Sequence, residues 1–390
     1  VLHLSYVPSL ISASALTRTR LPLLLLNTTP DSYLDETLTG QHILENHGIH
    51  GAQDLANILL RAGKSYQIVS GALDDPALVE GAIAWARVAA AAEQLKRLRV
   101  GLIGNPFEGM GDFSVGFTEL QLVAGPQVVS LDPREVARFA QEVSEAEVET
   151  ERQADLTRFT APADLDATLH NASVRAGLGL KKAIKIYDLD AFAMHFMAFN
   201  DVPDMPTVPF LGVSKLQAEG IGYAGEGDVA CASLVATVMR AFGGAMFTEM
   251  FCPDWQGDTL LMAHMGECNP ALAGRRARLQ AVPFKFGDLA DPVIVMGGFQ
   301  TGPATLANLV AVGKGSFRLT IAEVDIPEFP VLESMTMPHF KLKPRIPVGE
   351  FLTAYSKAGG SHHSVLIPGE RACALGDLAE LAGFDKVVIG

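Results

Sequence analysis

The sequence predicts an α/β protein, with doubly wound parallel-sheet domains in its N-terminal and central parts and an antiparallel β-rich domain at its C-terminus. In the first two parts, short apolar runs alternate with helical patterns, which is typical of parallel sheets covered by helices. From about residue 245 the pattern changes to a succession of strands with few helices. The 390 residues suit two or three domains, and we expect three, at residues 1–97, 98–244 and 245–390.

The N-terminal domain alternates between strands and helices. We expect strands at residues 23–26 and 66–70, and helices at residues 52–61 and 76–97. Gly63 suits the end of the first helix, and Asp75 with Pro76 suits the start of the second. Residues 1–4 already have a strand pattern with nothing before them, so we expect that the first part of this domain is missing.

The central domain is expected to open with a strand at residues 99–103. Asp132 and Pro133 then begin a charged helix that runs to about residue 152. Further helical patterns cover residues 165–178, 188–199 and 228–242, and the glycine pair 243–244 ends the last of them.

The C-terminal domain is expected to be mostly strands. They are predicted at residues 245–251, 259–265, 292–296 and 317–324. We expect helices only at residues 303–312 and within the last 25 residues.

Composition and charge exclude several classes of protein. Hydrophobic residues make up 48% of the chain, which excludes a disordered chain. The net charge of −14 and the lack of a long Lys/Arg run exclude a nucleic-acid partner. No apolar run reaches the length of about 18 residues that spans a bilayer, so we expect no membrane contact. The cysteines contain no CxxC pair, which predicts free thiols in a reducing, cytoplasmic compartment: Cys231, Cys252, Cys268 and Cys373.

Residues 222–228 place two carboxylates among glycines at the start of a helix. In a structural interpretation, Asp228 caps the helix and Glu226 is a solvated loop charge. In a functional interpretation, both carboxylates belong to a site. The segment alone leaves the two interpretations open.

Two apolar strands each carry one polar group. By strict alternation Glu249 shares a strand face with Phe247 and Phe251, so it is expected to point inward, where a carboxylate needs a partner or a metal ion. An exposed edge position is the alternative. His264 is either a ligand or a core histidine with a satisfied hydrogen bond.

Adjacent histidines follow a glycine pair near the C-terminus. The run Gly-Gly-Ser-His362-His363 is typical of a tight turn that presents an imidazole, and packing is the alternative. Neighbouring side chains of a strand point to opposite faces, so we expect at most one of the two to meet a given metal ion.

Taken together, two carboxylates and two imidazoles suit Mn²⁺, Co²⁺, Mg²⁺ or Zn²⁺ with open positions for water or substrate. The chain has no HExxH motif of a thermolysin-like hydrolase and no GxGxxG fingerprint of a nicotinamide-dependent dehydrogenase. A phosphate loop ending at residues 64–65 would need glycine where Ile58 stands. We interpret the glycine-rich stretch 101–112 as a loop at the carboxyl end of a parallel strand, where open sheets usually bind small molecules.

At these segments the sequence resembles the L-arabinose isomerase family. Residues 222–228 resemble a family segment that ends in Gly-Ala-Glu-Gly-Asp-Trp, and residues 247–249 resemble the start of Phe-Met-Glu-Asp-Tyr. Residues 263–267 resemble Ser/Ala-His-Met-Leu-Glu, and residues 358–364 resemble Ala-Gly-Gly-Ala-His-His-Thr. Four motifs in the family's order make the resemblance specific.

The resemblance implies a metal-dependent aldose–ketose isomerase that converts L-arabinose to L-ribulose, or a similar aldose, through an enediol. Its implied metal ligands are Glu226, Glu249, His264 and His363, and its two glutamates are also the catalytic acid and base. The metal is expected to be Mn²⁺, with Co²⁺ or Mg²⁺ as alternatives.

The resemblance also implies contacts to the sugar and between subunits. His50, Phe199 and His362 are the implied substrate-binding residues, and His50 would reach the site of a neighbouring subunit. The implied assembly is a homotrimer or homohexamer with sites at subunit interfaces.

Departures from the family pattern leave the sugar open. Val229 replaces the tryptophan of the first motif, Met250-Phe251 replaces an Asp-Tyr pair, and His47 stands where glutamine is usual. An L-fucose isomerase-like enzyme, another sugar isomerase and a catalytically altered metal- or sugar-binding relative are the alternatives, as is a metal-dependent hydrolase or lyase.

Overall fold

Parallel sheets form the first part of the chain and a mainly antiparallel sheet forms the last part in the computed structural model, which confirms the predicted fold class. The structure describes residues 2–3 and 7–390. The chain divides into two compact units, residues 1–90 and 91–390. The division into three domains stays a prediction. Of the strand expected at residues 1–4, Val1 and Leu4 lie outside the described residues.

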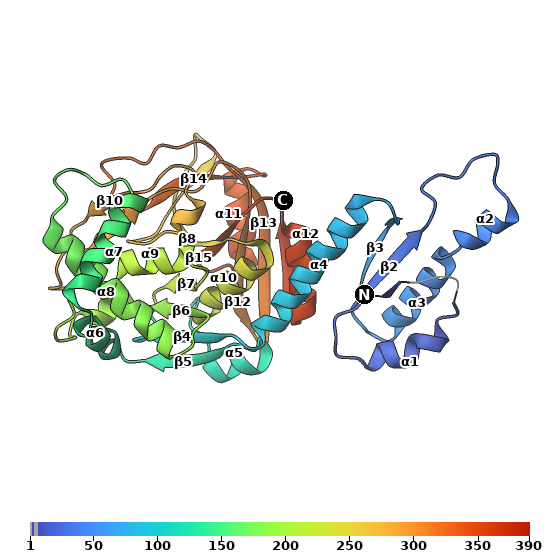
Figure 1. Cartoon of the computed structure of the whole chain (residues 1–390), viewed down its shortest axis with the longest axis horizontal. Coiled ribbons are helices and arrows are strands. Elements are labelled where there is room, and N and C mark those ends of the chain that lie inside the picture. The colour runs from blue at the N-terminus through green and yellow to red at the C-terminus, as the bar shows by residue number, and fades with distance from the viewer. Residues whose placement is uncertain (1, 4–6) are drawn as a thin grey trace. The chain divides into compact units, whose positions relative to one another are not determined.

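The first unit is a parallel three-stranded sheet with helices (Figure 1). Its strands are β1 (Leu2–His3), β2 (Leu24–Thr29) and β3 (Gln67–Ala72), and its helices are α1 (Leu10–Arg18), α2 (Gly40–Glu45), α3 (Ile49–Arg61) and the first part of α4 (Pro76–Leu95). Leu25 of β2 packs against Leu55 and Leu59 of α3 in its core. As predicted, α3 ends before Gly63, which has a φ of +66°, and Asp75 accepts a hydrogen bond from the α4 backbone at Ala77.

The second unit begins with a parallel four-stranded sheet in the order β5-β4-β6-β7. Its strands are β4 (Arg99–Ile103), β5 (Gln127–Leu131), β6 (Ala191–Met194) and β7 (Gly222–Gly225). Its helices are α5 (Phe117–Val123), α6 (Pro133–Gln141), α7 (Glu145–Arg158), α8 (Ala167–Ile186), α9 (Phe210–Ala218) and α10 (Val229–Phe242), and a 3-10 helix, η1 (Phe196–Phe199), follows β6.

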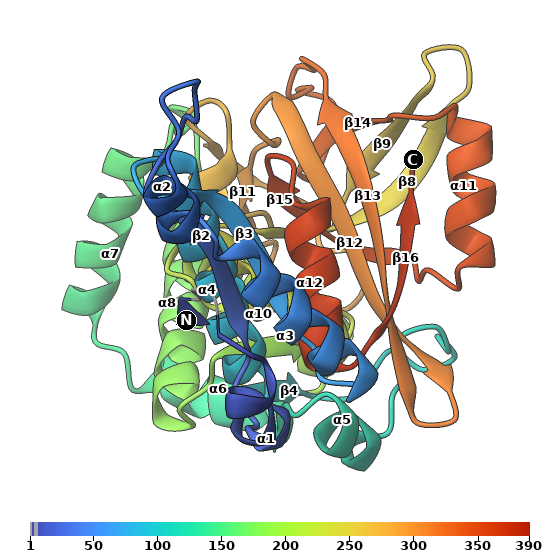
Figure 2. The ribbon, with the colours of Figure 1, turned by 90° about the vertical axis from the view of Figure 1, so that its right-hand side faces the viewer.

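A seven-stranded sheet follows in the order β12-β15-β8-β9-β14-β13-β16 (Figure 2). Neighbouring strands of this sheet are antiparallel, except that β13 and β16 are parallel. Strand β12 also pairs with β13, although the two are not neighbours in this order. The strands are β8 (Met246–Asp254), β9 (Thr259–Ala263), β12 (Gly302–Gly313), β13 (Ser316–Ile326), β14 (His339–Pro344), β15 (His363–Pro368) and β16 (Asp385–Ile389). The remaining elements are the β10 (Arg278–Ala281) and β11 (Val293–Met296) pair, η2 (Pro270–Leu272), α11 (Val348–Lys357) and α12 (Ala372–Ala382).

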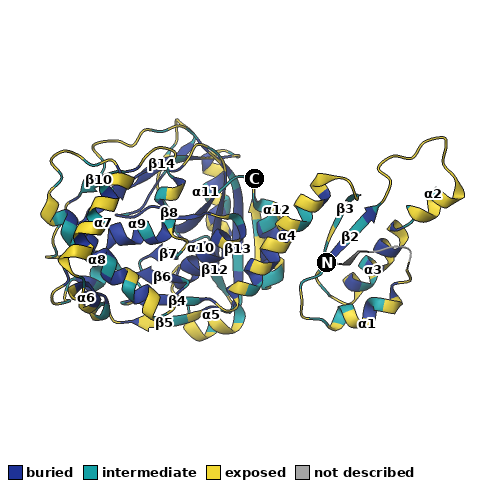
Figure 3. Ribbon diagram, viewed as in Figure 1, coloured by how far each residue is buried: buried dark blue, intermediate teal, exposed yellow. Residues whose placement is uncertain are grey.

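Helix α10 joins the two sheets of the second unit. It contacts β6 and β7 of the parallel sheet and β12 and β15 of the large sheet. Nearly all its residues are buried, because a helix packed on both sides must be apolar around its whole circumference (Figure 3). This helix begins directly after Glu226 and Asp228, so the same packing fixes both carboxylates.

Several of the helix predictions are wrong in whole or in part. The charged helix expected from Asp132 to about residue 152 is two helices, α6 and α7, separated at residues 142–144. Helix α11 lies outside the two places where helices were expected in the C-terminal domain. Residues 303–312 lie in β12, whose residues 304–310 are all buried; periodicity cannot distinguish a strand buried on both faces from a buried helix. Residues 188–199 form β6 and η1 instead of a helix. The last 25 residues contain α12 but end in β16, which pairs with β13.

The described part of the chain contains no helix long and apolar enough to cross a membrane. The four cysteines are free, as predicted, with two buried and two exposed.

Candidate active site

The carboxyl ends of the parallel strands bring together segments that are distant in sequence. Met194 at the end of β6 pairs with Gly225 at the end of β7, and Glu226 follows directly. The loop after β4 reaches the same edge, where its Phe107 N–H donates a 2.8 Å hydrogen bond to the carbonyl of Glu226. Open parallel sheets commonly bind ligands at this edge, and the predicted loop at residues 101–112 lies there.

Glu226 has an unusual backbone conformation. Its φ is +57°, in the left-handed region, and Gly227 follows with a φ of +85°. Residues other than glycine are strained in this region, and residues with such strained backbone angles concentrate at functional sites. The hydrogen bond from Phe107 N–H and the start of α10 hold this conformation, in which the Glu226 carboxylate lies beside His362 and His363.

The large sheet supplies the second glutamate and its imidazole neighbours. Glu249 of β8 lies opposite His363 of β15 on one side and opposite Ala263 of β9 on the other. His264 follows Ala263 directly. Strand register alone therefore places one carboxylate between two histidines that lie 99 residues apart in sequence (363 − 264).

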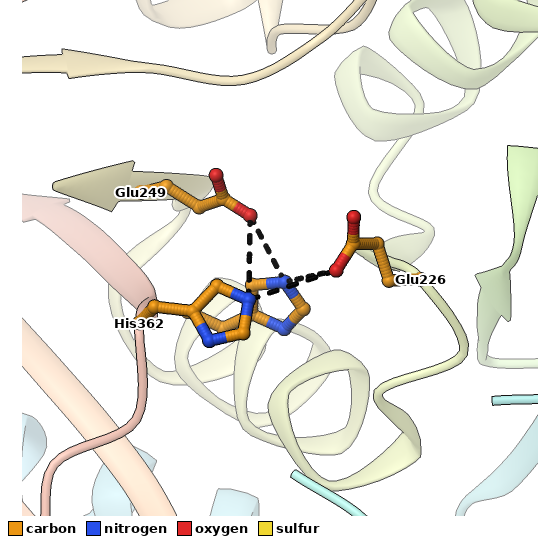
Figure 4. Close-up of side chains that lie close together, drawn as sticks. Glu226, Glu249 and His362 are labelled. Carbon is orange, nitrogen blue, oxygen red and sulfur yellow. Dashed lines mark ion pairs between the residues drawn. The ribbon is translucent and has the colours of Figure 1, made fainter. Parts of the chain in front are cut away.

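Four side chains converge on one point. Ligand-capable atoms of Glu226, Glu249, His362 and His363 all lie within 4.8 Å of one another. His363 Nε2 is 3.1 Å from Glu249 Oε1 and 3.6 Å from Glu226 Oε2. His362 Nε2 is 3.8 Å and 3.6 Å from the same two oxygens, and Figure 4 shows both glutamates directed at this ring.

Both adjacent histidines thus face the glutamates, contrary to the prediction that only one would. The alternation of a strand does not apply to His362, because β15 begins only at His363. The turn before it is fixed by Gly359, with a φ of +85°, and by Asn308 of β12, which donates hydrogen bonds to the carbonyl of His363 and to Ser361 Oγ.

His264 lies beside this cluster. Its Nε2 is 3.6 Å from Glu249 Oε1, and its Nδ1 is 3.1 Å from Glu267 Oε1. Glu267 is only 2% exposed and accepts a hydrogen bond from the buried Tyr223 hydroxyl. A buried carboxylate at Nδ1 favours the ring form that carries its proton there, which leaves the lone pair of Nε2 on the side of Glu249, available to a cation.

Asp228 orients His363 in the same way. Its Oδ2 lies 2.9 Å from His363 Nδ1, so Nδ1–H donates and Nε2 faces the glutamates. Its Oδ1 accepts a hydrogen bond from Cys231 N at 2.8 Å and so caps α10. Asp228 therefore both caps α10 and contacts a ring of the cluster.

Charge in the cluster is strongly coupled. Burial alone would lower the pKa of His363, but the carboxylates of Asp228, Glu226 and Glu249 outweigh it and raise this pKa well above its ordinary value. Burial would raise the pKa of Glu226, but the rings of His362 and His363 hold it well below its ordinary value. The carboxylates therefore need compensating positive charge at this point.

The cluster has the properties of a cation site. His363 Nε2 and Glu226 Oε2 are buried and have no hydrogen-bond partner among the described residues. Buried polar atoms normally have partners, so these two fit a ligand that accepts electron pairs. Mixed carboxylate and imidazole donors suit a divalent cation with positions open to substrate.

Comparison with known proteins identifies the family of this chain. Residues 118–244 match the model of the L-arabinose isomerase central domain, and residues 244–385 match that of the L-arabinose isomerase C-terminal domain. The two matches together cover every residue of the cluster. The chain belongs to the L-arabinose isomerase family. It is therefore classed as an aldose–ketose isomerase, an intramolecular oxidoreductase.

The sequences of relatives named L-arabinose isomerase match most of this chain. That of Geobacillus thermodenitrificans is 29% identical over 88% of this chain and 71% of its own length. That of Herpetosiphon aurantiacus is 29% identical over 88% and 70%. That of a Nocardioides species is 26% identical over 99% of this chain and 78% of its own length.

The resemblance implies two further site residues, Phe199 and His50. Phe199 is 0% exposed within η1, so its side chain has no surface for a sugar. Phe196, in the same helix, contacts the rings of Phe107 and His195. His50 is in α3 of the first unit, where its Nδ1 is 2.7 Å from Nε2 of His47.

Three functional contacts had little or no sequence signal. Asp112 binds His362, Phe113 stacks on His363 with ring centroids 4.7 Å apart, and Glu267 faces His264. Glu267 lies in the segment 263–267 and Asp112 ends the glycine-rich stretch 101–112, but neither pattern indicates which histidine the carboxylate contacts. The first two come from the loop after β4, and sequence spacing gives no reason to pair them with residues about 250 positions later.

Gly225 explains how His264 fits against β7. A Cβ at this position would lie 2.6 Å from Cε1 and 2.7 Å from Nε2 of the His264 ring. We expect Gly225→Ala to displace this ring, to lower the free energy of unfolding by about 1–3 kcal/mol and to weaken cation binding. Urea unfolding and Mn²⁺ titration measure the two effects.

Gly349→Ala is the matched control, since a Cβ there meets nothing within 4 Å and Gly349 is an exposed residue of α11. We expect it to be neutral or slightly stabilising. Equal stability and Mn²⁺ affinity of Gly225→Ala and wild type would contradict this explanation of the glycine.

Proposed function

We propose that the protein is a metal-dependent aldose–ketose isomerase that acts on L-arabinose or a similar aldose. The observation that carries the proposal is the convergence of Glu226, Glu249 and His363, two of whose facing atoms lack hydrogen-bond partners. We propose Glu226, Glu249, His264 and His363 as the metal ligands and Mn²⁺ as the metal, with Co²⁺ or Mg²⁺ as alternatives.

Isomerisation needs help because the C2–H of an aldose is a weak acid. A divalent cation bound at the cluster would polarise the sugar carbonyl and stabilise the enediolate that forms when the proton leaves. The residues of the chain must then move two protons, one between C2 and C1 and one between the two oxygens.

The two glutamates suit these proton transfers. Each has one carboxylate oxygen in the cluster, and imidazoles hold the pKa of both below its ordinary value, so both are ionised and can accept a proton. We propose that one glutamate removes the C2 proton and returns it at C1, while the other carries the proton between oxygens. With a cation bound, its charge would replace the proton that the carboxylates otherwise hold on the rings, so His264 and His363 are neutral ligands in this scheme. His362 contacts the sugar.

Ketose formation from a panel of aldoses by the Mn²⁺-loaded protein tests this proposal. We expect turnover of L-arabinose or of another aldose in the panel. Folded, metal-loaded protein that converts none of them would contradict the proposal and favour a metal- or sugar-binding relative without turnover.

The enediol route predicts a specific isotope pattern. A carboxylate that carries the carbon proton can exchange it with solvent, so we expect deuterium at C1 of the ketose formed in D₂O. Mass spectrometry or proton NMR of the product measures it. A hydride shift between C2 and C1 would leave the product carbon without deuterium.

Another aldose remains a specific candidate because of one departure near Glu249. Met250-Phe251 stands where the family has Asp-Tyr, and a β-bulge between Met250 and Cys252 turns the strand there. An apolar pair at this place removes polar contacts, which favours a sugar with a different hydroxyl arrangement. Relative kcat/KM values across the aldose panel distinguish the candidates.

Family membership also supports the remaining proposals. We propose a cytoplasmic homotrimer or homohexamer in which His50 reaches the site of a neighbouring subunit. Phe199 stays a proposed sugar contact, although its side chain is 0% exposed. Sedimentation or mass photometry measures the assembly state.

A further inference from the structure

The loop at residues 104–113, here called the β4 loop, contacts three residues of the cluster but contributes no proposed metal ligand. Phe107 N–H binds the carbonyl of Glu226, and the Phe113 ring stacks on His363 with an interplanar angle of 15°. Asp112 binds His362. A loop that supports three separate site residues has more contacts than a connection between β4 and α5 requires.

Gly104 fixes where this loop leaves the sheet. Its φ is +83°, and a Cβ there would lie 2.4 Å from the Cβ of Ala198. Only glycine allows this close approach and this backbone turn. The loop therefore has a defined starting direction toward the cluster.

Asp112 makes the most specific of the three contacts. Its Oδ2 accepts hydrogen bonds from both the backbone N–H of His362, at 3.1 Å, and the ring Nδ1 of His362, at 2.6 Å. A single carboxylate oxygen thus fixes both the backbone and the ring of one residue. With Nδ1 held, Nε2 faces Glu226 and Glu249 at 3.6 Å and 3.8 Å.

His362 and His363 therefore have matching supports. Asp228 holds Nδ1 of His363, and Asp112 holds Nδ1 of His362. Asp228 lies inside a motif beside Glu226, whereas Asp112 comes from a different strand end, 250 residues before the histidine that it binds. Partners of this kind set the ring orientation and the proton position of the histidine they bind.

We infer that Asp112 is a positioning residue of the isomerase, which acts through His362 to aim its Nε2 at the sugar bound beside the two glutamates. This inference rests on the proposed function. It assigns a role to the β4 loop, whereas the metal ligands themselves remain the two glutamates with His264 and His363.

A double-mutant cycle between Asp112 and His362 tests the inference. We expect Asp112→Ala to lower kcat/KM by about ten- to hundredfold, as loss of such partners usually does, and Asp112→Asn, which keeps an oxygen acceptor, to recover part of it. In a His362→Gln background, Asp112→Ala should add at most about a twofold loss, because the two residues act as a unit.

Two further readouts do not depend on turnover. Mn²⁺ affinity of Asp112→Ala should stay within about twofold of wild type, because the proposed ligands are intact. Binding of L-arabinitol, an alditol that has no aldehyde to react, should weaken in Asp112→Ala and in His362→Gln alike. Glu108→Gln, an exposed carboxylate of the same loop, is the matched control and should resemble wild type in every assay.

Additive losses in the cycle, or unchanged alditol binding by Asp112→Ala, would overturn the inference, because Asp112 would then be only a fold contact. Failure of the proposed function has a different signature, since the wild-type protein itself would form no ketose. Alditol binding would still report on Asp112 in that case.

Discussion

Glu249→Gln is expected to abolish isomerisation while leaving the protein folded. Glutamine has nearly the same shape as glutamate, but it cannot accept the carbon proton and is a poor ligand for a hard cation. Loss of a positioned acid–base group typically costs about 10²–10⁴-fold, so we expect kcat to fall by at least about 10²-fold. Steady-state ketose formation at saturating sugar and Mn²⁺ measures it.

The effect on stability separates chemistry from folding. Glu249 lies among three imidazoles in a largely buried position, so we expect the variant to retain a cooperative unfolding transition. Glu350→Gln makes the same chemical change at an exposed residue of α11 and should leave kcat at the wild-type value. Substantial residual turnover by Glu249→Gln would rule out Glu249 as a proton-transfer group.

Asp228→Asn is expected to weaken Mn²⁺ binding by about 10–100-fold. The aspartate carboxylate accepts a hydrogen bond from His363 Nδ1–H, with 2.9 Å between Oδ2 and Nδ1. The proton therefore stays on Nδ1, and Nε2 is free as a ligand. An asparagine can present its NH₂ group to Nδ1, which then favours a proton on Nε2 and removes that ligand. Free Mn²⁺ measured by electron paramagnetic resonance during titration gives the dissociation constant.

Asparagine preserves the second role of Asp228. It caps helices as well as aspartate does, so the N-terminus of α10 should keep its hydrogen bond and the free energy of unfolding should change little. Asp132→Asn makes the same change at the N-cap of α6, where the carboxylate binds Arg134 and no site residue, and should leave Mn²⁺ affinity unchanged. If Asp228→Asn also binds Mn²⁺ with wild-type affinity, Asp228 is a helix cap and nothing more.

Local sequence signals predicted much of the fold. The N-cap and proline at Asp75-Pro76 and Asp132-Pro133 located helix starts, and Gly243 located the end of α10. These signals act over one or two turns, so they need no knowledge of tertiary packing. They failed at β12, because a strand buried on both faces contains the same apolar residues as a buried helix.

The site was predictable as a set of residues but not as an arrangement. Glu249 and His264 stood out because a polar group in an apolar strand needs a partner. The register that sets Glu249 opposite His363 depends on pairing between β8 and β15, and the sequence of either strand does not contain it. Asp112 was beyond reach for the same reason, since its contact with His362 depends on how the β4 loop meets the turn before β15.

The most direct test of the account is metal dependence of ketose formation. The wild-type protein would be freed of metal with a chelator, assayed with its best aldose, and assayed again after addition of Mn²⁺. We predict that turnover is lost on chelation and returns as about one ion binds per chain, because one cluster offers the converging ligand atoms in the described residues. Undiminished turnover by demonstrably metal-free protein would contradict the central claim that the Glu226–Glu249–histidine cluster works through a bound cation.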